Sequence, residues 1–372
     1  LKHSQTNTKQ RARAMQKDII LNGDCVEILK TLPDKSTNLI FADPPYFMQT
    51  EGELLRVGGD KFRGVEDEWD KFNNLAHYDE FCKAWLSECK RILKDNGSIW
   101  VIGSFQNIFR LGYIMQDLGF WILNDVIWTK PNPVPNFKGT RFCNAHETLL
   151  WCAKDKNAKY TFNYKTMKYL NNNKQEKSVW NIGICIGNER LKGDDGKKVH
   201  STQKPESLLE KVVLSSSKEG DLILDPFFGT GTTGVVAKKF GRHFLGIEQN
   251  KLYIQEAQKR IDKIEIISNK ITRAELEIKP PKVSLKSLIK ASFLISNERL
   301  YNKAGVYICH LYEGEKVRDE SEILSIHKMA AKHLNKSNHN GWNYFYIMRD
   351  SKLKSLDSLR YEYQMQINKL KL

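Results

Sequence analysis

A glycine-rich turn between an apolar segment and a helical one is the feature that most constrains how this chain can fold. Residues 221–225 (Asp-Leu-Ile-Leu-Asp) predict a short buried strand, and apolar residues recur at helical spacing over 232–240. The turn between them opens a G-x-G-x-x-G pattern, formed by Gly229, Gly231 and Gly234. A second strand is expected at 243–248. This β-α-β unit predicts an α/β, doubly wound Rossmann-like sheet with helices on both faces.

Such a turn suits a cofactor that contains a nucleoside. Glycines let the backbone approach the ligand, and the N-terminus of the following helix attracts an anionic group. Glu248 lies 19 residues after Gly229, at the end of the next expected strand, where its carboxylate can accept hydrogen bonds from both ribose hydroxyls. The anion can be a pyrophosphate or the carboxylate of S-adenosylmethionine. The turn alone therefore does not name the cofactor, and a tight turn without a ligand is a third interpretation.

Strands and helices alternate elsewhere in the chain too. Strands are expected at 19–21, 38–42, 98–102 and 121–128. Helices are expected at 78–94, 107–118, 205–217 and 250–264. Residues 47–75 are polar and contain four glycines, and a loop of this length in a compact domain is typically a lid or a binding segment.

An irregular, basic region interrupts this alternation at 130–204. It contains 15 basic and 6 acidic residues, and the whole chain carries a formal net charge of +15. Such a charge favours a polyanionic partner, because each phosphate that is neutralised releases condensed counterions. We therefore expect a nucleic-acid partner, with a generically basic protein as the alternative.

Composition divides the chain further. Residues 1–17 hold five basic and no acidic side chains, and we expect a disordered extension there. The main domain is placed at 18–275, and a Lys-Pro-Pro-Lys segment within 276–285 predicts an extended linker. The remaining residues, 286–372, suit a small C-terminal domain.

Cysteine and hydropathy patterns exclude several classes of protein. The seven cysteines form no C-x-x-C pair, which argues against a zinc site or a disulfide framework and favours reduced thiols in the cytoplasm. No apolar run approaches the roughly 18 residues that cross a bilayer. We therefore expect no metal, no membrane partner and a cytoplasmic location.

The segment Asp43-Pro44-Pro45-Tyr46 follows the strand expected at 38–42 and indicates a specific chemistry. An adenine exocyclic amine is a weak nucleophile, because its lone pair is delocalised into the ring. The Asp43 carboxylate and the Pro44 carbonyl can accept its two N–H groups, and the two prolines hold these acceptors rigidly for in-line transfer. The Tyr46 ring can stack on a base that has rotated out of the duplex. As an isolated tetrapeptide, DPPY could also be a structural turn.

Together the two motifs resemble those of the amino-methyltransferases of DNA. DPPY placed before Phe228-Gly229-Thr230-Gly231 is similar to the order in the β class, a circular permutation of the common fold. Further segments look like those of the GANTC-specific HinfI and CcrM type, at 41–49, 132–137, 141–148, 200–205 and 340–342. The resemblance covers about 18–372. It implies transfer of a methyl group from S-adenosylmethionine to N6 of adenine in duplex DNA, within GANTC, by base flipping.

The resemblance also implies roles in cofactor binding. Asp24 would accept a hydrogen bond from the adenine amine of the cofactor, and Lys204 would pair with its carboxylate. The implied cofactor residues are Asp24, Cys25, Asp43, Thr202, Gln203, Lys204, Asp225, Phe227, Phe228, Gly229, Thr230, Gly231 and Glu248. The structural alternatives are a turn aspartate at position 24, a helix start at Pro205 and a surface acid at position 248.

Target recognition in this family maps to the region between the two motifs, 130–200 here, and in part to 47–75. The candidate DNA contacts are Lys130, Asn132, Asn136, Lys138, Arg141 and Asn144. Arginine to guanine and asparagine to adenine are favoured major-groove pairings, with phosphate contacts or turn capping as the alternative. His146-Glu147 is expected to be a structural pair. Four aromatic residues of the C-terminal domain either stack on bases or form its core: Trp342, Tyr344, Phe345 and Tyr346.

Other functions compete with this interpretation. Methylation of cytosine N4 would use the same two acceptors. An NAD-dependent oxidoreductase would use the glycine turn but leaves DPPY and the basic region unexplained, and intact DPPY argues against a catalytically dead DNA-binding module. The resemblance further suggests a homodimer, a cognate restriction endonuclease in a restriction-modification system and a bacterial, nucleoid-associated location, none of which the residues test.

Overall fold

The computed structural model describes residues 15–47, 54–55, 61–62, 72–136, 139–193, 196, 198–200, 202–278 and 282–369. The chain divides into two compact units, with the boundary between Ile278 and Lys279. This boundary falls inside the range expected for the linker, whose residues 279–281 lie outside the described part. Residues 1–14 of the expected extension also lie outside it. Each unit is described by itself.

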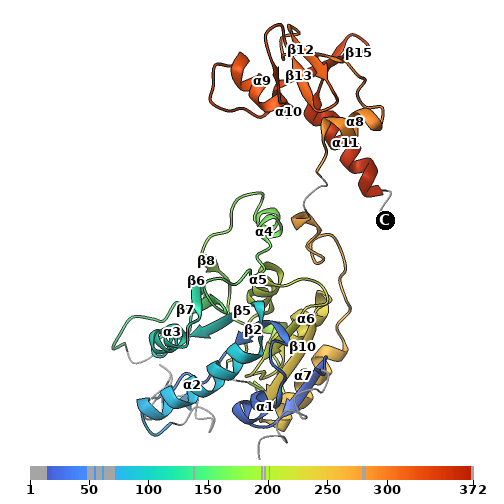
Figure 1. Ribbon diagram of the computed structural model, residues 1–372. Coiled ribbons are helices and arrows are strands. Elements are labelled where there is room, and N and C mark those ends of the chain that lie inside the picture. Colours follow the sequence, from blue (N-terminus) through green and yellow to red (C-terminus); the bar gives the residue numbers. More distant parts are fainter. Residues whose placement is uncertain are drawn as a thin grey trace, which may run out of the picture. The chain divides into compact units, whose positions relative to one another are not determined.

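An eight-stranded sheet forms the frame of the first unit, with the order β1-β10-β9-β2-β5-β7-β6-β8 (Figure 1). Its strands are β1 (Ile19–Asn22), β2 (Thr37–Ala42), β5 (Leu93–Gly103), β6 (Trp121–Thr129), β7 (His146–Ala153), β8 (Val179–Asn181), β9 (Leu222–Asp225) and β10 (His243–Glu248). β7 is antiparallel to both of its neighbours, whereas the other adjacent pairs are parallel. The doubly wound α/β class is therefore confirmed.

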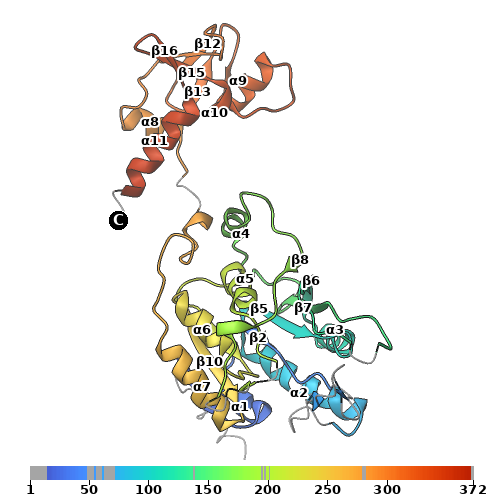
Figure 2. The same cartoon turned by 180° about the vertical axis from the view of Figure 1, so that it is seen from behind.

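Helices cover both faces of this sheet, and the strands divide their side chains between two cores (Figures 1 and 2). Ile40 and Ala42 pack in one cluster and Leu39 and Phe41 in the other, because successive side chains of a strand point to opposite faces. The first layer contains α1 (Cys25–Thr31), α2 (Leu75–Ile92) and α3 (Ile108–Asp117). The second contains α4 (Tyr164–Leu170), α5 (Glu206–Ser216), α6 (Thr232–Lys239) and α7 (Lys251–Asp262). Short 3-10 turns lie at η3 (Gly187–Glu189) and η4 (Glu275–Glu277).

One sequence expectation was wrong at the centre of the sheet. Residues 146–153, assigned to the irregular basic region, form β7 between β5 and β6. Residues 149–153 are all buried, so this strand lacks the alternation of apolar and polar side chains that identifies a half-exposed strand. The recognition region expected at 130–200 therefore contains part of the core.

The segment expected to be a loop at 47–75 also contains regular structure. Its described residues include the paired strands β3 (Leu54–Leu55) and β4 (Lys61–Phe62), and α2 begins at Leu75. The Asn74 side chain caps α2 by accepting a hydrogen bond from the backbone N–H of His77. The other residues of this segment, 48–53, 56–60 and 63–71, lie outside the described part.

The carboxyl ends of four adjacent parallel strands meet at one edge of the sheet. In the order β1, β10, β9 and β2, these ends lead to Gly23, Glu248, Asp225 and Asp43. β9 continues into α6 in one layer, whereas β2 is followed by α2 in the other, so the edge between them is a topological switch point. Ligands of doubly wound sheets bind at such points.

The second unit is built on a six-stranded antiparallel sheet with the order β14-β13-β12-β11-β15-β16. Its elements are α8 (Leu285–Lys290), β11 (Arg299–Tyr301), β12 (Tyr307–Tyr312), β13 (Lys316–Arg318), β14 (Ile323–Leu324), α9 (Ile326–His333), α10 (Gly341–Tyr344), β15 (Tyr346–Arg349), β16 (Lys352–Ser355) and α11 (Leu356–Lys369). Trp342 and Phe345 are buried in its core, with Tyr344 packed against them, which favours the core interpretation of these aromatics. Among the described residues of both units, no helix combines the length and apolar character needed to cross a membrane.

Candidate active site

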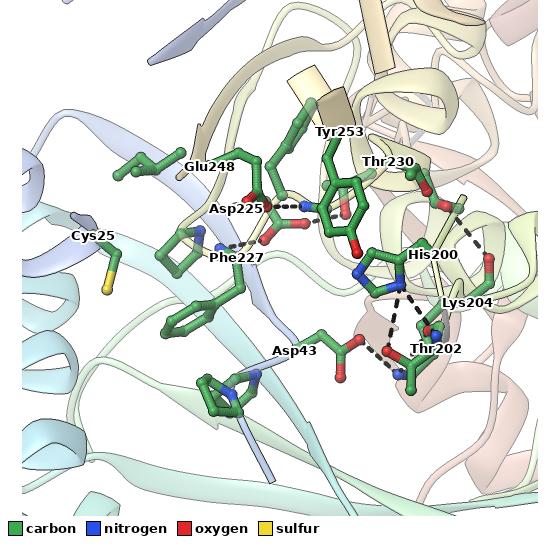
Figure 3. Close-up of a pocket in the computed structure, with 18 of the residues that line it drawn as sticks. Cys25, Asp43, His200, Thr202, Lys204, Asp225, Phe227, Thr230, Glu248 and Tyr253 are labelled. Atoms are coloured by element: carbon green, nitrogen blue, oxygen red, sulfur yellow. Dashed lines mark hydrogen bonds and ion pairs between the residues drawn. The ribbon is translucent and has the colours of Figure 1, made fainter. Parts of the chain in front are cut away.

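A cavity of about 270 Å³ lies at the switch point and brings the two sequence motifs together (Figure 3). This volume is near the lower end of the roughly 300–1,000 Å³ typical of ligand pockets. Its lining includes these predicted residues: Cys25, Asp43, Pro44, Pro45, Tyr46, Thr202, Gln203, Lys204, Asp225, Phe227, Phe228, Gly229, Thr230 and Glu248. Segments separated by almost 200 residues in the sequence thus form one site.

Two predicted cofactor residues are not in the lining. Asp24 caps α1, with its Oδ1 accepting a hydrogen bond from the backbone N–H of Glu27 at 3.0 Å, and its Oδ2 accepts another from the Gln249 amide at 3.2 Å. Gly231 starts α6 at φ +78°, and a Cβ there would lie 2.7 Å from the Cβ of Ala257. Gly231 therefore permits the close approach of α6 and α7.

The glycine turn is braced by two carboxylates. Asp225 Oδ1 accepts a hydrogen bond from the backbone N–H of Phe227 at 2.9 Å, and its Oδ2 accepts one from the Thr233 hydroxyl at 2.6 Å. Glu248 Oε2 accepts a hydrogen bond from the backbone N–H of Gly229 at 2.8 Å. Since each carboxylate oxygen has two lone pairs, Glu248 can hold the turn and still accept hydrogen bonds from a ligand.

The ionisation of Asp225 should make stability depend on pH. Burial raises the pKa of this carboxyl to about 7, although Thr233 and the Phe227 N–H lower it. Because the pKa of Asp225 is higher in the folded than in the unfolded chain, the free energy of unfolding is greatest below the pKa of the unfolded chain. It falls as the pH rises towards 7. We expect the melting temperature of the wild type, relative to Asp225→Asn, to fall between pH 4.5 and 7.5. Thermal unfolding of both proteins over this pH range checks the prediction. A difference in melting temperature that does not change with pH would contradict it.

Phe228 packs between the turn and β10. Its ring stacks on Phe244 with centroids 5.7 Å apart, and a Cβ added at Gly246 would lie 2.4 Å from the Phe228 ring. Because Gly246 has no side chain, the Phe228 ring can lie directly against β10 beside the pocket.

Gly246→Ala should consequently displace Phe228. We expect a loss of about 1–3 kcal/mol in the free energy of unfolding, as for other overpacked cores, together with weaker binding of the methyl donor. Denaturant unfolding and calorimetry measure the two effects. Gly183→Ala is the stability control, because its Cβ would meet only Asn132 Oδ1 at 3.6 Å. Equal stabilities of the two variants would show that Phe228 can move freely.

The DPPY corner is held by charged and hydroxyl groups. Asp43 Oδ2 accepts a hydrogen bond from Lys204 Nζ at 2.6 Å, and Asp43 Oδ1 accepts one from the Tyr46 hydroxyl at 2.9 Å. Burial raises the pKa of Asp43 against the opposing effect of Lys204. The carbonyl of Pro45 accepts a hydrogen bond from the Tyr78 hydroxyl of α2 at 2.8 Å. These contacts anchor the corner to α2 and to the segment that precedes α5.

Sequence reasoning missed several residues at this site. Glu147 on β7 accepts a hydrogen bond from the Tyr46 hydroxyl at 3.1 Å, although it was expected to be only structural. His200 lies against Tyr253, with ring centroids 4.7 Å apart, and both line the cavity. Burial, Lys204 and Arg190 lower the pKa of His200 to about 4, so its imidazole is neutral at physiological pH. A single sequence offers no signal for contacts between such distant positions.

The candidate DNA contacts fall into two groups. Lys130 Nζ donates to Glu147 Oε1 at 2.5 Å, and Asn132 Oδ1 accepts a hydrogen bond from the backbone N–H of Ile184 at 3.1 Å, so both side chains have intramolecular partners. Asn136, on the loop between β6 and β7, is half-buried, and its amide donates a hydrogen bond to the backbone carbonyl of Arg141 at 2.8 Å. Arg141 and Asn144 are exposed on the same loop. The Arg141 guanidinium lies 5.2 Å from the centre of the Phe105 ring. Lys138 lies outside the described residues.

An acid-braced glycine turn beside a DPPY corner, at the switch point of a doubly wound sheet, defines a methyltransferase site. The family model described as DNA methylase matches residues 37–259. Type II methyltransferase M.HinfI of Haemophilus influenzae is 64% identical over 347 residues, which cover 93% of this chain and 97% of that protein. The chain therefore belongs to the DNA methylase family, and it is an S-adenosylmethionine-dependent DNA methyltransferase.

Two further proteins are similar to this chain. Type II methyltransferase M2.DpnII of Streptococcus pneumoniae is 42% identical over 247 residues, 66% of this chain and 90% of that protein. The solved structure of the PvuII DNA methyltransferase (cytosine-N4-specific) has a TM-score of 0.53 at 22% identity, over 70% of this chain and 92% of the other. The latter likeness concerns the fold. The fold, enzyme class and methyl donor expected from the sequence are thus confirmed.

Proposed function

We propose that this enzyme methylates N6 of adenine within GANTC in duplex DNA, by base flipping and direct in-line transfer. The observation that carries the proposal is the position of Asp43 and Tyr46 in the same cavity as the Glu248-braced turn. The resemblance to GANTC-specific enzymes and the 64% identity to M.HinfI support the recognition sequence.

The cavity residues fit the methyl donor by the chemistry of their side chains. Glu248 offers a carboxylate to the ribose hydroxyls, and Phe227 offers an apolar wall. The N-terminal end of α6, whose Thr232 and Thr233 line the cavity beside Thr230, favours an anionic group. When bound, S-adenosylmethionine supplies an electrophilic methyl group on its sulfonium. Asp24 lies between Gly23 and Cys25, which both line the cavity, and it is the proposed acceptor for the adenine amine of the donor.

The DPPY corner would prepare the target amine. Asp43 and the Pro44 carbonyl accept its two N–H groups, which increases electron density on the nitrogen and places its lone pair. The ring of Tyr46 offers a face on which the rotated base stacks. Because Tyr46 and Pro45 are themselves held by hydrogen bonds, these groups need little rearrangement during the reaction.

The loop between β6 and β7 would read the DNA. β7 pairs with β5 in opposite direction, Gly103 facing Thr148, so this loop emerges at the same edge as the cavity. Its half-buried Asn136 and its exposed Arg141 and Asn144 are the proposed contacts, with additional ones from 47–75 and the second unit. A homodimer, a cognate restriction endonuclease and a cytoplasmic, nucleoid-associated location also belong to this proposal.

A methylation assay with identification of the product tests the proposal. The protein is incubated with tritiated S-adenosylmethionine and duplexes that contain GANTC or a scrambled site, and the digested DNA is separated by chromatography. We expect label in N6-methyladenine from the GANTC duplex alone. Label in N4-methylcytosine would overturn the choice of base, and equal label in both duplexes would overturn the choice of site.

A further inference from the structure

Glu147 lies at the start of β7 and belongs to a cluster of charged groups behind the DPPY corner. Its side chain is 15% exposed and contacts three others. Glu147 Oε1 accepts a hydrogen bond from Lys130 Nζ, and its Oε2 accepts one from the Tyr46 hydroxyl at 3.1 Å. Lys204 Nζ lies 4.0 Å from the same Oε2. Two ammonium groups and two carboxylates, those of Asp43 and Glu147, therefore balance within one buried cluster.

The position of Lys204 conflicts with the role proposed for Asp43. Lys204 Nζ donates to Asp43 Oδ2 at 2.6 Å, so an ammonium group neutralises the carboxylate that the target amine needs. As the methyl group would pass to the amine nitrogen, its bond to the sulfonium sulfur would break, and the nitrogen would carry a positive charge until it lost a proton to solvent. An ammonium group beside it then opposes the reaction, whereas an unpaired carboxylate favours it.

We propose that Glu147 is a positioning residue of the catalytic centre, which holds the Tyr46 hydroxyl and receives Lys204 when the target amine reaches Asp43. This inference rests on the proposed function. Glu147 Oε2 already lies at ion-pair distance from Lys204 Nζ, so a displacement of roughly 1 Å shortens that contact to the 2.7–2.9 Å of a charge-assisted hydrogen bond. The displacement leaves Asp43 with a net negative charge to face the amine.

Tyr46 links the same two carboxylates. Its hydroxyl lies 2.9 Å from Asp43 Oδ1 and 3.1 Å from Glu147 Oε2. A hydroxyl has one hydrogen, so Tyr46 donates to one carboxylate at a time. Glu147 can keep this hydrogen bond while Asp43 binds the amine, and the Tyr46 ring then stays in place for stacking.

The ionisation of Glu147 is consistent with this role. Burial alone would raise the pKa of its carboxyl, but Lys204 and Lys130 outweigh that effect and lower it. Glu147 is therefore ionised wherever the enzyme works near neutral pH. Its charge also raises the pKa of Asp43, which couples the two carboxylates.

Glu147→Gln tests the inference, because it keeps the size and an oxygen acceptor for Tyr46 but removes the charge that receives Lys204. We expect kcat to fall about 10- to 100-fold, with KM for DNA and for the donor within about threefold. The acid limb of the kcat/KM profile should also move to lower pH, since loss of the Glu147 charge lowers the pKa of Asp43. Affinity for S-adenosylhomocysteine, measured by calorimetry, should stay the same.

Glu210→Gln is the matched control, since Glu210 forms an ion pair with Lys239 at 2.7 Å on the helical layer. It should leave kcat and the acid limb unchanged. An unchanged kcat in Glu147→Gln, or a lower kcat with an unmoved acid limb, would overturn the inference. The latter outcome would mean that Glu147 only supports the fold. A wild-type enzyme that leaves GANTC unmethylated would instead contradict the proposed function.

A second variant covers the case in which Glu147→Gln does not fold. Glu147→Asp keeps the charge and moves it by one methylene group. We expect a smaller fall in kcat, less than about tenfold, with the acid limb in its wild-type position. A larger fall with a displaced limb would overturn the inference as well.

Discussion

Asp43→Ala is expected to lower the rate of methyl transfer by about a thousandfold or more. The substitution removes the proposed acceptor of the amine hydrogens and leaves the Lys204 ammonium group facing the substrate. Loss of one preorganised charge-stabilising group typically costs 10²–10³-fold in rate, and both effects act here. Single-turnover assays with tritiated donor and a GANTC duplex measure the loss. Asp95→Asn is the control, because Asp95 is an exposed residue that pairs with Lys35.

Asp43→Ala should also destabilise the fold. A second variant can separate this loss of stability from the loss of activity. Lys204 is only 8% exposed, and removal of Asp43 leaves its buried ammonium group with Glu147 as a weaker partner at 4.0 Å. The cost should therefore lie below the roughly 3–5 kcal/mol of a buried charge with no partner. Adding Lys204→Met removes that charge and should recover much of the stability without restoring activity. If the double variant regained methylation, Asp43 would not be the acceptor.

Glu248→Ala should weaken binding of S-adenosylmethionine about 100-fold or more. A hydrogen bond to a charged group contributes about 1.5–3 kcal/mol, and the ribose offers two hydroxyls to this carboxylate. The substitution also frees the backbone N–H of Gly229, which Glu248 Oε2 holds at 2.8 Å. Calorimetric titration with the donor measures the change.

Two variants separate the causes of this effect. Glu248→Gln keeps one oxygen to accept the Gly229 N–H, and we expect a loss of affinity of only about tenfold. Glu256→Ala on α7, which removes a partner of Lys259, should bind the donor like the wild type. Unchanged affinity in Glu248→Ala would exclude the assignment of Glu248 to the ribose.

Local patterns were sufficient to predict most elements of the first unit. The strands expected at 19–21, 38–42 and 243–248 lie within one residue of β1, β2 and β10 at each end. They are short apolar segments bounded by turn residues, so local sequence is informative. β7 was missed because a strand that is covered on both faces has no alternation to detect.

Some residues of the candidate site could likewise be predicted from local sequence, and others could not. DPPY and the glycine turn each lie at a strand end, and their chemistry is readable from adjacent residues. Asp24 also caps α1, and Gly231 allows α6 to approach Ala257 of α7, a contact that the residues next to the turn do not reveal. Lys130, predicted to contact DNA, forms an ion pair with Glu147, a partner that the sequence did not indicate.

The sequence by itself determined the doubly wound class, the two chemical motifs and the order in which they occur, because each depends on residues that are neighbours in the chain. Only the tertiary structure decided that Glu147 and Lys204 meet Asp43. Glu147 and Lys204 lie 104 and 161 positions after Asp43 in the sequence, so their contact with it follows from the order of the strands. Burial then decides their charges, since desolvation and ion pairing act only once distant segments have come together.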